Sequence, residues 1–140
     1  KGTLAGEPIP VFNEGKMVRD FTYIDDIAEG VVRVIDSPAA PDPAWDSDAP
    51  SPATSRAPWR IFNIGNNNRV ELMRYIRAIE KVLGREAKLN LLPMQAGDVQ
   101  ATEADTSLLS AAVGFKPDTP VEEGVRRFVE WYCDYYKVSR

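Results

Sequence analysis

Residues Val18–Ile27 read V-R-D-F-T-Y-I-D-D-I, and the hydrophobic period changes within this stretch. Arg19–Tyr23 has the composition of an extended segment. From Asp25 onward a helix is predicted, because apolar residues recur at the spacing i, i+4, i+7, i+8. These apolar residues are Ile27, Val31, Val34 and Ile35. Asp25 and Asp26 suit the first turn, where carboxylates stabilise free amides and the helix dipole, and Pro38 ends the helix.

Three further stretches have the composition of β-strands. Ile9–Asn13 is a short run of this kind, and Pro10 inside it indicates an edge strand or extended segment with free backbone groups. Trp59–Ile64 alternates between apolar and polar residues and ends at Gly65, which predicts a strand followed by a turn. Ala87–Leu92 is predicted as another strand.

Three more helices are predicted from residues that cap helix ends. Asn68 with Glu71 matches a capping box at the start of one helix, and Gly84 suits its C′ position. Asp105 can cap a short helix that ends near Gly114.

The last helix is predicted to follow Thr119–Glu122, which reads as a capping box with Pro120 at the first helical position, and to run to about Lys137. The resulting order is β–α–loop–β–α–β–α–α. This order predicts an α/β fold (an α+β fragment) in a single unit over residues 1–140.

A proline-rich segment separates the first helix from the second predicted strand. Residues 38–58 contain six prolines in 21 positions, a composition that cannot build a packed element. A domain linker would have the same composition. We interpret the segment as an extended loop anchored by Trp45, because too few residues precede it to form a core of their own.

The composition excludes several classes of function. With 44% hydrophobic and 27% charged residues and a net charge of −4, the chain resembles a soluble globular domain without the basic surface that nucleic acids or anionic membranes require. No apolar run approaches a membrane span or a signal peptide. The single cysteine, Cys133, cannot form an internal disulfide and favours a reducing compartment such as the cytoplasm. Without any histidine, a Cys–His nucleophile is impossible and no metal-ligand spacing is present.

Two polar motifs are candidates for a binding site. Arg19 precedes acidic residues, so it can form a surface ion pair, or its planar fork can meet a phosphate or pyrophosphate. The stretch Met94–Val99, M-Q-A-G-D-V, reads without further context as a polar turn. Phe62–Asn68, F-N-I-G-N-N-N, lacks the spacing of a glycine-rich phosphate loop and reads as an architectural strand-to-helix turn.

The order and spacing of these three motifs resemble the C-terminal part of NAD-dependent nucleotide-sugar epimerases, which belong to the extended short-chain dehydrogenase/reductase family. The likeness covers nearly all 140 residues and is greatest for the UDP-glucuronate 4-epimerases. The fold that it implies is the substrate-binding region of an extended Rossmann-type reductase. Its first helix and the Trp59–Ile64 strand would pack on an N-terminal NAD-binding domain that this chain lacks.

The resemblance also assigns substrate-binding residues. Arg19 would contact the diphosphate of a UDP-sugar, and Asp98 would accept hydrogen bonds from the ribose hydroxyls. Gln95 would face the nucleotide as a neutral hydrogen-bonding group; many relatives have arginine there, although glutamine looks usual in the uronate-epimerase branch. The backbone around Phe12 would present an amide and a carbonyl to the uracil edge.

The residues that the family uses for catalysis have no counterpart in this sequence. No glycine-rich dinucleotide motif occurs, and no tyrosine has a lysine four residues later. By this resemblance the chain contains no catalytic residue, and NAD would be bound by a domain outside it. The opening K-G-T-L-A-G, without an initiator methionine, suggests a cut inside a larger protein, although tag removal or processing would give the same start.

The resemblance implies that this chain binds the UDP-sugar within a 4-epimerase, an isomerase that interconverts UDP-glucuronate and UDP-galacturonate. It also implies that the parent protein of this chain is a homodimer. Two alternatives remain open. The parent could be another extended reductase, such as a 4,6-dehydratase or a UDP-glucuronate decarboxylase, or the chain could be a non-catalytic nucleotide-binding module.

Overall fold

Two short strand pairs hold the beginning of the chain against segments from much later in the sequence. A computed structural model describes residues 1–139. β1 (Ile9–Val11) pairs in parallel with β4 (Leu89–Leu91), and Val11 lies opposite Leu91. β2 (Val18–Asp20) pairs antiparallel with β3 (Arg69–Glu71) in a separate two-stranded sheet. The α/β fold class predicted above is therefore confirmed.

Helices make up most of the regular structure. They are α1 (Gly2–Ala5), the 3-10 helix η1 (Phe12–Gly15), α2 (Ile24–Ile35), α3 (Leu72–Leu83), α4 (Ser107–Val113) and α5 (Val121–Tyr136). None of the helices in the described part of the chain has the length and apolar composition of a membrane span.

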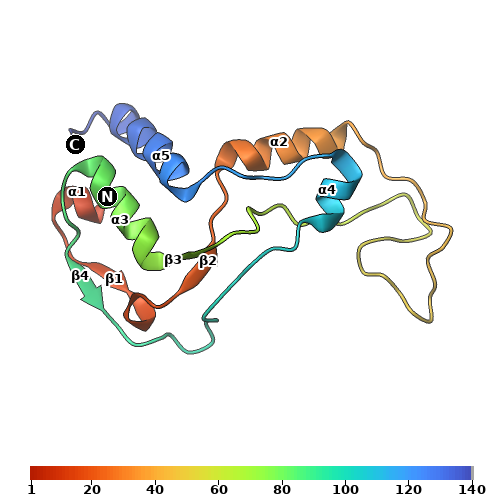
Figure 1. Cartoon of the computed structure of the whole chain (residues 1–140), viewed down its shortest axis with the longest axis horizontal. Helices are drawn as coiled ribbons and strands as arrows, with labels where there is room; N and C mark the ends of the chain where they lie inside the picture. The colour runs from red at the N-terminus through yellow and green to blue at the C-terminus, as the bar shows by residue number, and fades with distance from the viewer. Residues whose placement is uncertain (140) are drawn as a thin grey trace.

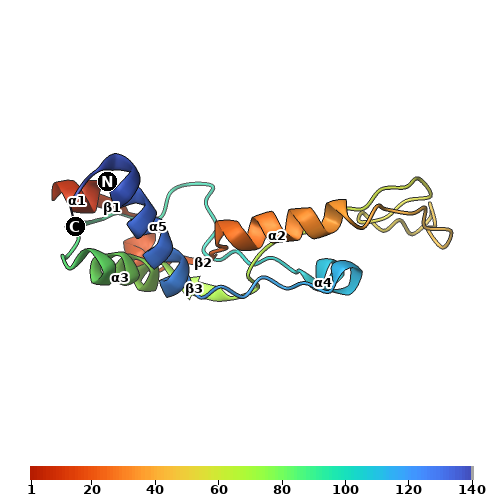
Figure 2. The same cartoon turned by 90° about the horizontal axis from the view of Figure 1, so that it is seen from above.

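The elements form an elongated molecule with two ends of different character. In Figures 1 and 2, α1, β1, β4, α3 and α5 gather at one end, where both termini also lie. α2, α4 and the proline-rich loop extend to the other end, and β2 and β3 lie between the two groups.

The hydrophobic core lies where α3 packs on α5. Its buried members are Val70, Ala78, Leu83, Val121, Val125, Val129 and Cys133. Removing such an aliphatic side chain from water contributes about 1.5–3 kcal/mol each. Phe21 and Tyr75 stack beside this core with ring centroids 4.3 Å apart, and burial raises the pKa of Tyr75. Phe21, the residue after β2, thereby contacts α3, in addition to the pairing of β2 with β3.

α2 is amphipathic, as predicted, but much of its apolar surface is uncovered. Gly30 is buried, and a β-carbon there would lie 3.3 Å from the Ile64 side chain, so this face packs closely. An apolar stripe along another face is exposed. It consists of Ile24, Ala28, Val31, Val32 and Ile35.

The strand predicted at Trp59–Ile64 is wrong. These residues belong to no strand or helix. Their backbone bonds into the proline-rich loop join the Trp59 amide to the Ala57 carbonyl at 2.9 Å and the Ile61 amide to the Ala53 carbonyl at 3.1 Å. A strand needs a partner for its backbone groups, and no strand in residues 1–139 pairs with this run.

Two predicted capping boxes are also wrong. Residues Arg69–Glu71 are drawn into β3, so α3 begins at Leu72 without a side-chain cap from Asn68, and the Leu72 amide bonds to the Met17 carbonyl at 2.8 Å. At α5 the Thr119 side chain makes no cap, and its amide donates to Asp26 at 3.1 Å instead. Tertiary pairing has replaced local capping at both helix starts.

The glycines predicted at two helix C-termini are confirmed, whereas Asp105 lies one residue before Thr106, which occupies the N-cap position of α4. The Ser107 amide donates to the Asp105 carboxylate at 2.9 Å at the start of α4, and this bond lowers the pKa of Asp105. Gly84 and Gly114 end α3 and α4 in the left-handed conformation that glycine adopts without strain.

Residues 38–58 form a loop without helix or strand that leaves the end of α2 and returns toward it (Figure 1). Trp45 holds this loop to itself: its indole donates to the Ser51 carbonyl at 3.2 Å, and its own carbonyl accepts from Arg56 at 3.3 Å.

Candidate functional site

The parallel pair of β1 and β4 brings two of the predicted site segments to one edge. Phe12 follows directly after β1, and the segment that carries Gln95 follows β4. The Glu14 amide donates to the Leu92 carbonyl at 3.1 Å, which joins the two segments just beyond the strand ends. In α/β folds ligands commonly bind outside the carboxyl ends of parallel strands.

The second half of this segment runs beside β2. Val18 and Ala101 form an isolated parallel bridge. The Val18 amide donates to the Gln100 carbonyl at 2.9 Å, and the Thr102 amide donates to the Val18 carbonyl at 3.2 Å. These bonds hold residues 100–102 alongside the strand that carries Arg19.

Arg19 and Asp98 meet although 79 positions separate them in the sequence. The Arg19 Nη2 lies 2.9 Å from the Asp98 Oδ1, while Nη1 donates to the Val18 and Gln100 carbonyls at 2.9 and 3.2 Å. The Arg19 side chain is 25% exposed and that of Asp98 is 34% exposed. The guanidinium is therefore held in one orientation while still reachable from solvent.

Both side chains keep hydrogen-bonding capacity that no described residue uses. On Arg19 the Nε hydrogen and the second Nη2 hydrogen have no partner in residues 1–139. On Asp98, Oδ1 also accepts from the Val99 amide at 2.7 Å, and Oδ2 has no partner there. The pair can thus donate to an anion and accept from a hydroxyl at adjacent points.

Gln95 and Phe12 lie near this pair in the chain but are not joined to it by side-chain contacts. Gln95 is exposed, and its carbonyl accepts from the Asp98 amide at 3.2 Å across a turn in which Gly97 has a left-handed φ of 83°. Phe12 is half-buried at the start of η1. No hydrogen bond or ring contact links Phe12 to Arg19 or Asp98 within the described part of the chain.

The turn at Asn63–Asn68 has the architectural character that its composition indicates. Asn66 is 5% exposed, and its side-chain amide donates to the Thr119 carbonyl at 2.9 Å and the Phe21 carbonyl at 3.3 Å. The sequence reasoning missed Asp20, whose carboxylate binds the backbone of this turn. Its position directly after Arg19 in the sequence could have indicated that Asp20 takes part in the same site.

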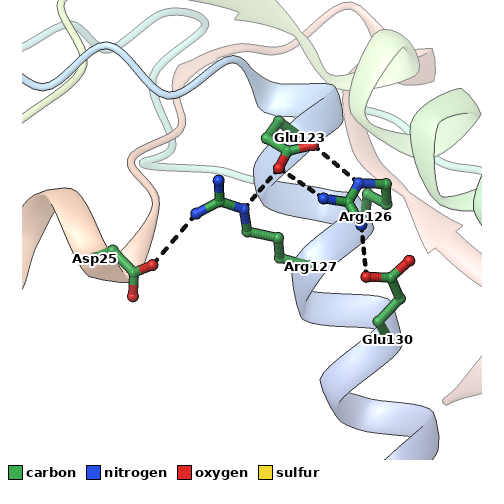
Figure 3. Close-up of polar contacts among 5 residues, drawn as sticks. All are labelled: Asp25, Glu123, Arg126, Arg127 and Glu130. Carbon is green, nitrogen blue, oxygen red and sulfur yellow. Dashed lines mark hydrogen bonds and ion pairs between the residues drawn. The ribbon is translucent and has the colours of Figure 1, made fainter.

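A separate network of charged side chains lies on α5. Figure 3 shows Glu123 between Arg126 and Arg127, with Asp25 and Glu130 at the two ends. Every group drawn there has an ionic partner, so the network satisfies itself. Residues 1–139 contain no cluster of three or more His, Cys, Asp or Glu side chains that could hold a metal ion.

Known proteins resemble this chain along nearly its whole length. Residues 1–65 match the NAD dependent epimerase/dehydratase family. The "Uncharacterized 37.6 kDa protein in cld 5'region" of Escherichia coli O111:H- is 54% identical over 99% of this chain and 41% of its own length. The "Probable UDP-glucuronate 4-epimerase" of Rhizobium meliloti (strain 1021) is 47% identical over 94% of this chain and 39% of its own length.

Among solved structures, the UDP-glucuronic acid 4-epimerase from Bacillus cereus in complex with UDP-glucuronic acid and NAD superposes on 96% of this chain and 38% of its own, with a TM-score of 0.74. At 24% identity this likeness shows the fold. The chain spans about two-fifths of the length of the curated relatives it matches.

These likenesses define the class of protein. The chain is similar to proteins of the NAD dependent epimerase/dehydratase family, whose model matches its residues 1–65, and it has the fold of the extended short-chain dehydrogenases/reductases. Within that family it is similar to UDP-glucuronate 4-epimerases along nearly its whole length.

Proposed function

We propose that this chain is the UDP-sugar-binding portion of a nucleotide-sugar 4-epimerase that interconverts UDP-glucuronate and UDP-galacturonate. The proposal is supported by relatives that carry this name, among them a UDP-glucuronate 4-epimerase of Arabidopsis thaliana that is 37% identical over 97% of this chain. The whole polypeptide that contains this chain is called the full-length protein below.

One observation carries the proposal: the contact between Arg19 and Asp98 at 2.9 Å. The Arg19 fork, with two N–H groups unused, would bind the diphosphate of the nucleotide, and the free Oδ2 of Asp98 would accept from the ribose hydroxyls. A nucleoside diphosphate carries both groups, the diphosphate at the ribose C5′ and the hydroxyls at C2′ and C3′, so one ligand would contact both the arginine and the carboxylate.

Gln95 and the backbone at Phe12 would complete the nucleotide site. Both segments emerge from the carboxyl ends of the parallel pair β1 and β4, so a ligand on that edge reaches both. In this proposal the exposed amide of Gln95 contacts the nucleotide, and the backbone at Phe12 contacts the uracil edge. Binding energy from the UDP part would then orient the sugar ring for reaction.

The described residues do not form an NAD site. No glycine-rich strand–turn–helix occurs in residues 1–139, and the N-terminus of α2 carries Asp25 and Asp26, whose carboxylates would repel a pyrophosphate. We therefore propose that NAD, which would supply the hydride acceptor for the sugar, is held outside this chain. The side chains of this chain would bind and orient the substrate.

The first experiment removes the arginine in the full-length protein. We expect Arg19→Ala to weaken UDP binding by about 1.5–3 kcal/mol, or roughly 10- to 150-fold in Kd, because charge-assisted hydrogen bonds to the diphosphate are lost. Isothermal titration with UDP measures the change. Arg77→Ala is the matched control, since Arg77 is exposed on α3 and has no hydrogen bond or ion pair within residues 1–139.

Unchanged UDP affinity in Arg19→Ala would refute the assignment. The same preparations are then assayed for conversion of UDP-glucuronate to UDP-galacturonate by NMR. Turnover to a dehydrated or decarboxylated sugar would favour another extended reductase. UDP binding without any turnover would favour a non-catalytic module.

A further inference from the structure

Asp20 is the most heavily bonded carboxylate near the proposed site. Its Oδ1 accepts from the Asn66 amide at 3.1 Å. Its Oδ2 accepts from the Asn67 amide at 3.0 Å and from the Ala104 amide at 3.3 Å. Three backbone donors from two distant segments therefore converge on one half-buried side chain.

Close packing accompanies these bonds. Gly65 is buried, and a β-carbon built on it would lie 2.5 Å from the Ala104 β-carbon and 2.9 Å from the Asp20 Oδ2. Only glycine permits this approach, so the turn packs tightly against the Asp20 carboxylate and the segment at Ala104. We call Asp20, Gly65 and Ala104 the clasp.

The clasp lies on the opposite side of β2 from the arginine. Successive side chains of a strand point to opposite faces, so Arg19 and Asp20 project in opposite directions. On one face Arg19 bonds to Asp98, and on the other Asp20 bonds to Ala104, six positions later in the same segment. The segment that carries Asp98 is thus fastened to β2 at both of its ends.

We propose that Asp20 is a positioning residue of the nucleotide site, which sets the distance between Arg19 and Asp98 by fixing residues 98–104 and the Asn66–Asn67 turn to β2. Asp20 touches no ligand in this proposal and acts through its neighbour and through Asp98. The inference rests on the proposed function. It adds that the two adjacent residues have different roles: Arg19 binds the ligand, and Asp20 fixes the surrounding backbone.

The physical basis is the donor count at the carboxylate. All three contacts are N–H groups, so each requires an acceptor. An asparagine at position 20 offers one acceptor oxygen and turns its NH₂ group toward donors, which leaves amides unpaired. The segment from Asp98 to Ala104 would then lose its fastening at the Ala104 end.

The test is Asp20→Asn in the full-length protein. We expect UDP binding to weaken about tenfold in isothermal titration, because misplacing the pair forfeits roughly one charge-assisted hydrogen bond. The matched control is Asp26→Asn, because Asp26 is a half-buried carboxylate that accepts one amide, from Thr119 at 3.1 Å, away from residues 98–104. This control should leave UDP affinity within about twofold, which is under 0.5 kcal/mol.

A double-mutant cycle separates positioning from general stability. In an Arg19→Ala background, Asp20→Asn should change UDP affinity less than it does alone, because one of the two groups whose separation Asp20 sets is gone. Equal effects in both backgrounds would overturn the proposal, as would wild-type affinity in Asp20→Asn. If Arg19→Ala itself has no effect, the proposed function fails and not the clasp alone.

A second variant covers the case in which Asp20→Asn does not fold. Gly65→Ala keeps the Asp20 carboxylate but pushes Ala104 and Asp20 away from the turn, so it should also weaken UDP binding. The weakening should again be smaller in the Arg19→Ala background. Full UDP affinity in a folded Gly65→Ala protein would contradict the proposal. Amide hydrogen exchange at Asn66, Asn67 and Ala104 reports directly whether the three bonds are lost.

Discussion

The contact between Arg19 and Asp98 leaves both side chains open to a ligand. Its two side chains are 25% and 34% exposed, and ion pairs in such partly solvated positions contribute about 0–1 kcal/mol. In the proposed function, a diphosphate would bind the two unused N–H groups of Arg19, and little stability depends on the ion pair itself. The backbone carbonyls of Val18 and Gln100 keep the arginine oriented meanwhile.

At the same scale, Gly65 is the residue whose replacement has the clearest steric consequence. We expect Gly65→Ala to lower the free energy of unfolding by about 1–3 kcal/mol, because the new methyl group would lie 2.5 Å from the Ala104 β-carbon. Chemical denaturation of the full-length protein measures this. Gly65→Ala combined with Ala104→Gly should recover part of the loss, since only the 2.9 Å contact with Asp20 then remains. A double variant no more stable than the single one would contradict this packing.

At the scale of the element, α5 is connected to α2 through charge. Arg127 donates to Glu123 at 2.6 Å and lies 3.4 Å from Asp25 at the start of α2 (Figure 3). Its guanidinium also lies over the Tyr23 ring, 5.5 Å from the ring centroid. Glu123 also bonds to Arg126 at 2.7 Å. These two arginines lower the pKa of Glu123 from 4.5 to about 2, first through their hydrogen bonds.

This lowered pKa predicts an acid-dependent contribution to stability. A carboxyl whose pKa is lower in the folded state stabilises the fold above its unfolded value, and the contribution is lost as pH falls from about 4.5 toward 2. We therefore expect Glu123→Gln to lower the melting temperature at neutral pH, with a difference from wild type that shrinks over that range. Glu86→Gln, an exposed glutamate without a partner in residues 1–139, is the control. A difference independent of pH would argue against the network.

At the scale of the whole molecule, the exposed apolar stripe of α2 is the feature expected to lower the stability of the isolated chain most. Ile24 is 65% exposed and Ile35 is 70% exposed, while Ile61 in the run predicted as a strand is 55% exposed. A helix with so much uncovered apolar surface gains little from its own packing. We propose that the remainder of the full-length protein covers this surface.

The prediction is that residues 1–140 alone are marginally stable and melt at low temperature without a cooperative transition. Ile35→Gln should change the stability of this isolated chain by less than about 0.5 kcal/mol, as for an exposed site. It should destabilise the full-length protein by about 1–2 kcal/mol, because burial there is lost. Calorimetry of both proteins tests this, with Arg77→Ala as the control. A cooperative melt of the isolated chain at high temperature would contradict the prediction.

Much of the helical structure could be predicted from local signals. α2 and α5 were placed to within one or two residues, and Gly84 and Gly114 marked helix ends, because periodicity and left-handed glycines are properties of neighbouring residues. Trp59–Ile64 has the alternating pattern of a strand, but no strand in residues 1–139 pairs with it, so the strand predicted from this pattern does not form. Asn68 and Thr119 were predicted to cap α3 and α5. Instead, residues after Asn68 pair in β3, and the Thr119 amide donates to Asp26.

The candidate site divides in the same way. Residue chemistry in the sequence made Arg19 a candidate, since an arginine fork suits a phosphate wherever it lies, and the resemblance of the sequence to the epimerase family added Gln95, Asp98 and Phe12. Only the tertiary structure decided that Arg19 meets Asp98 and that Asp20 gathers three amides from two segments. Contacts across 79 positions depend on strand pairing between distant segments, and short-range sequence patterns do not encode that pairing.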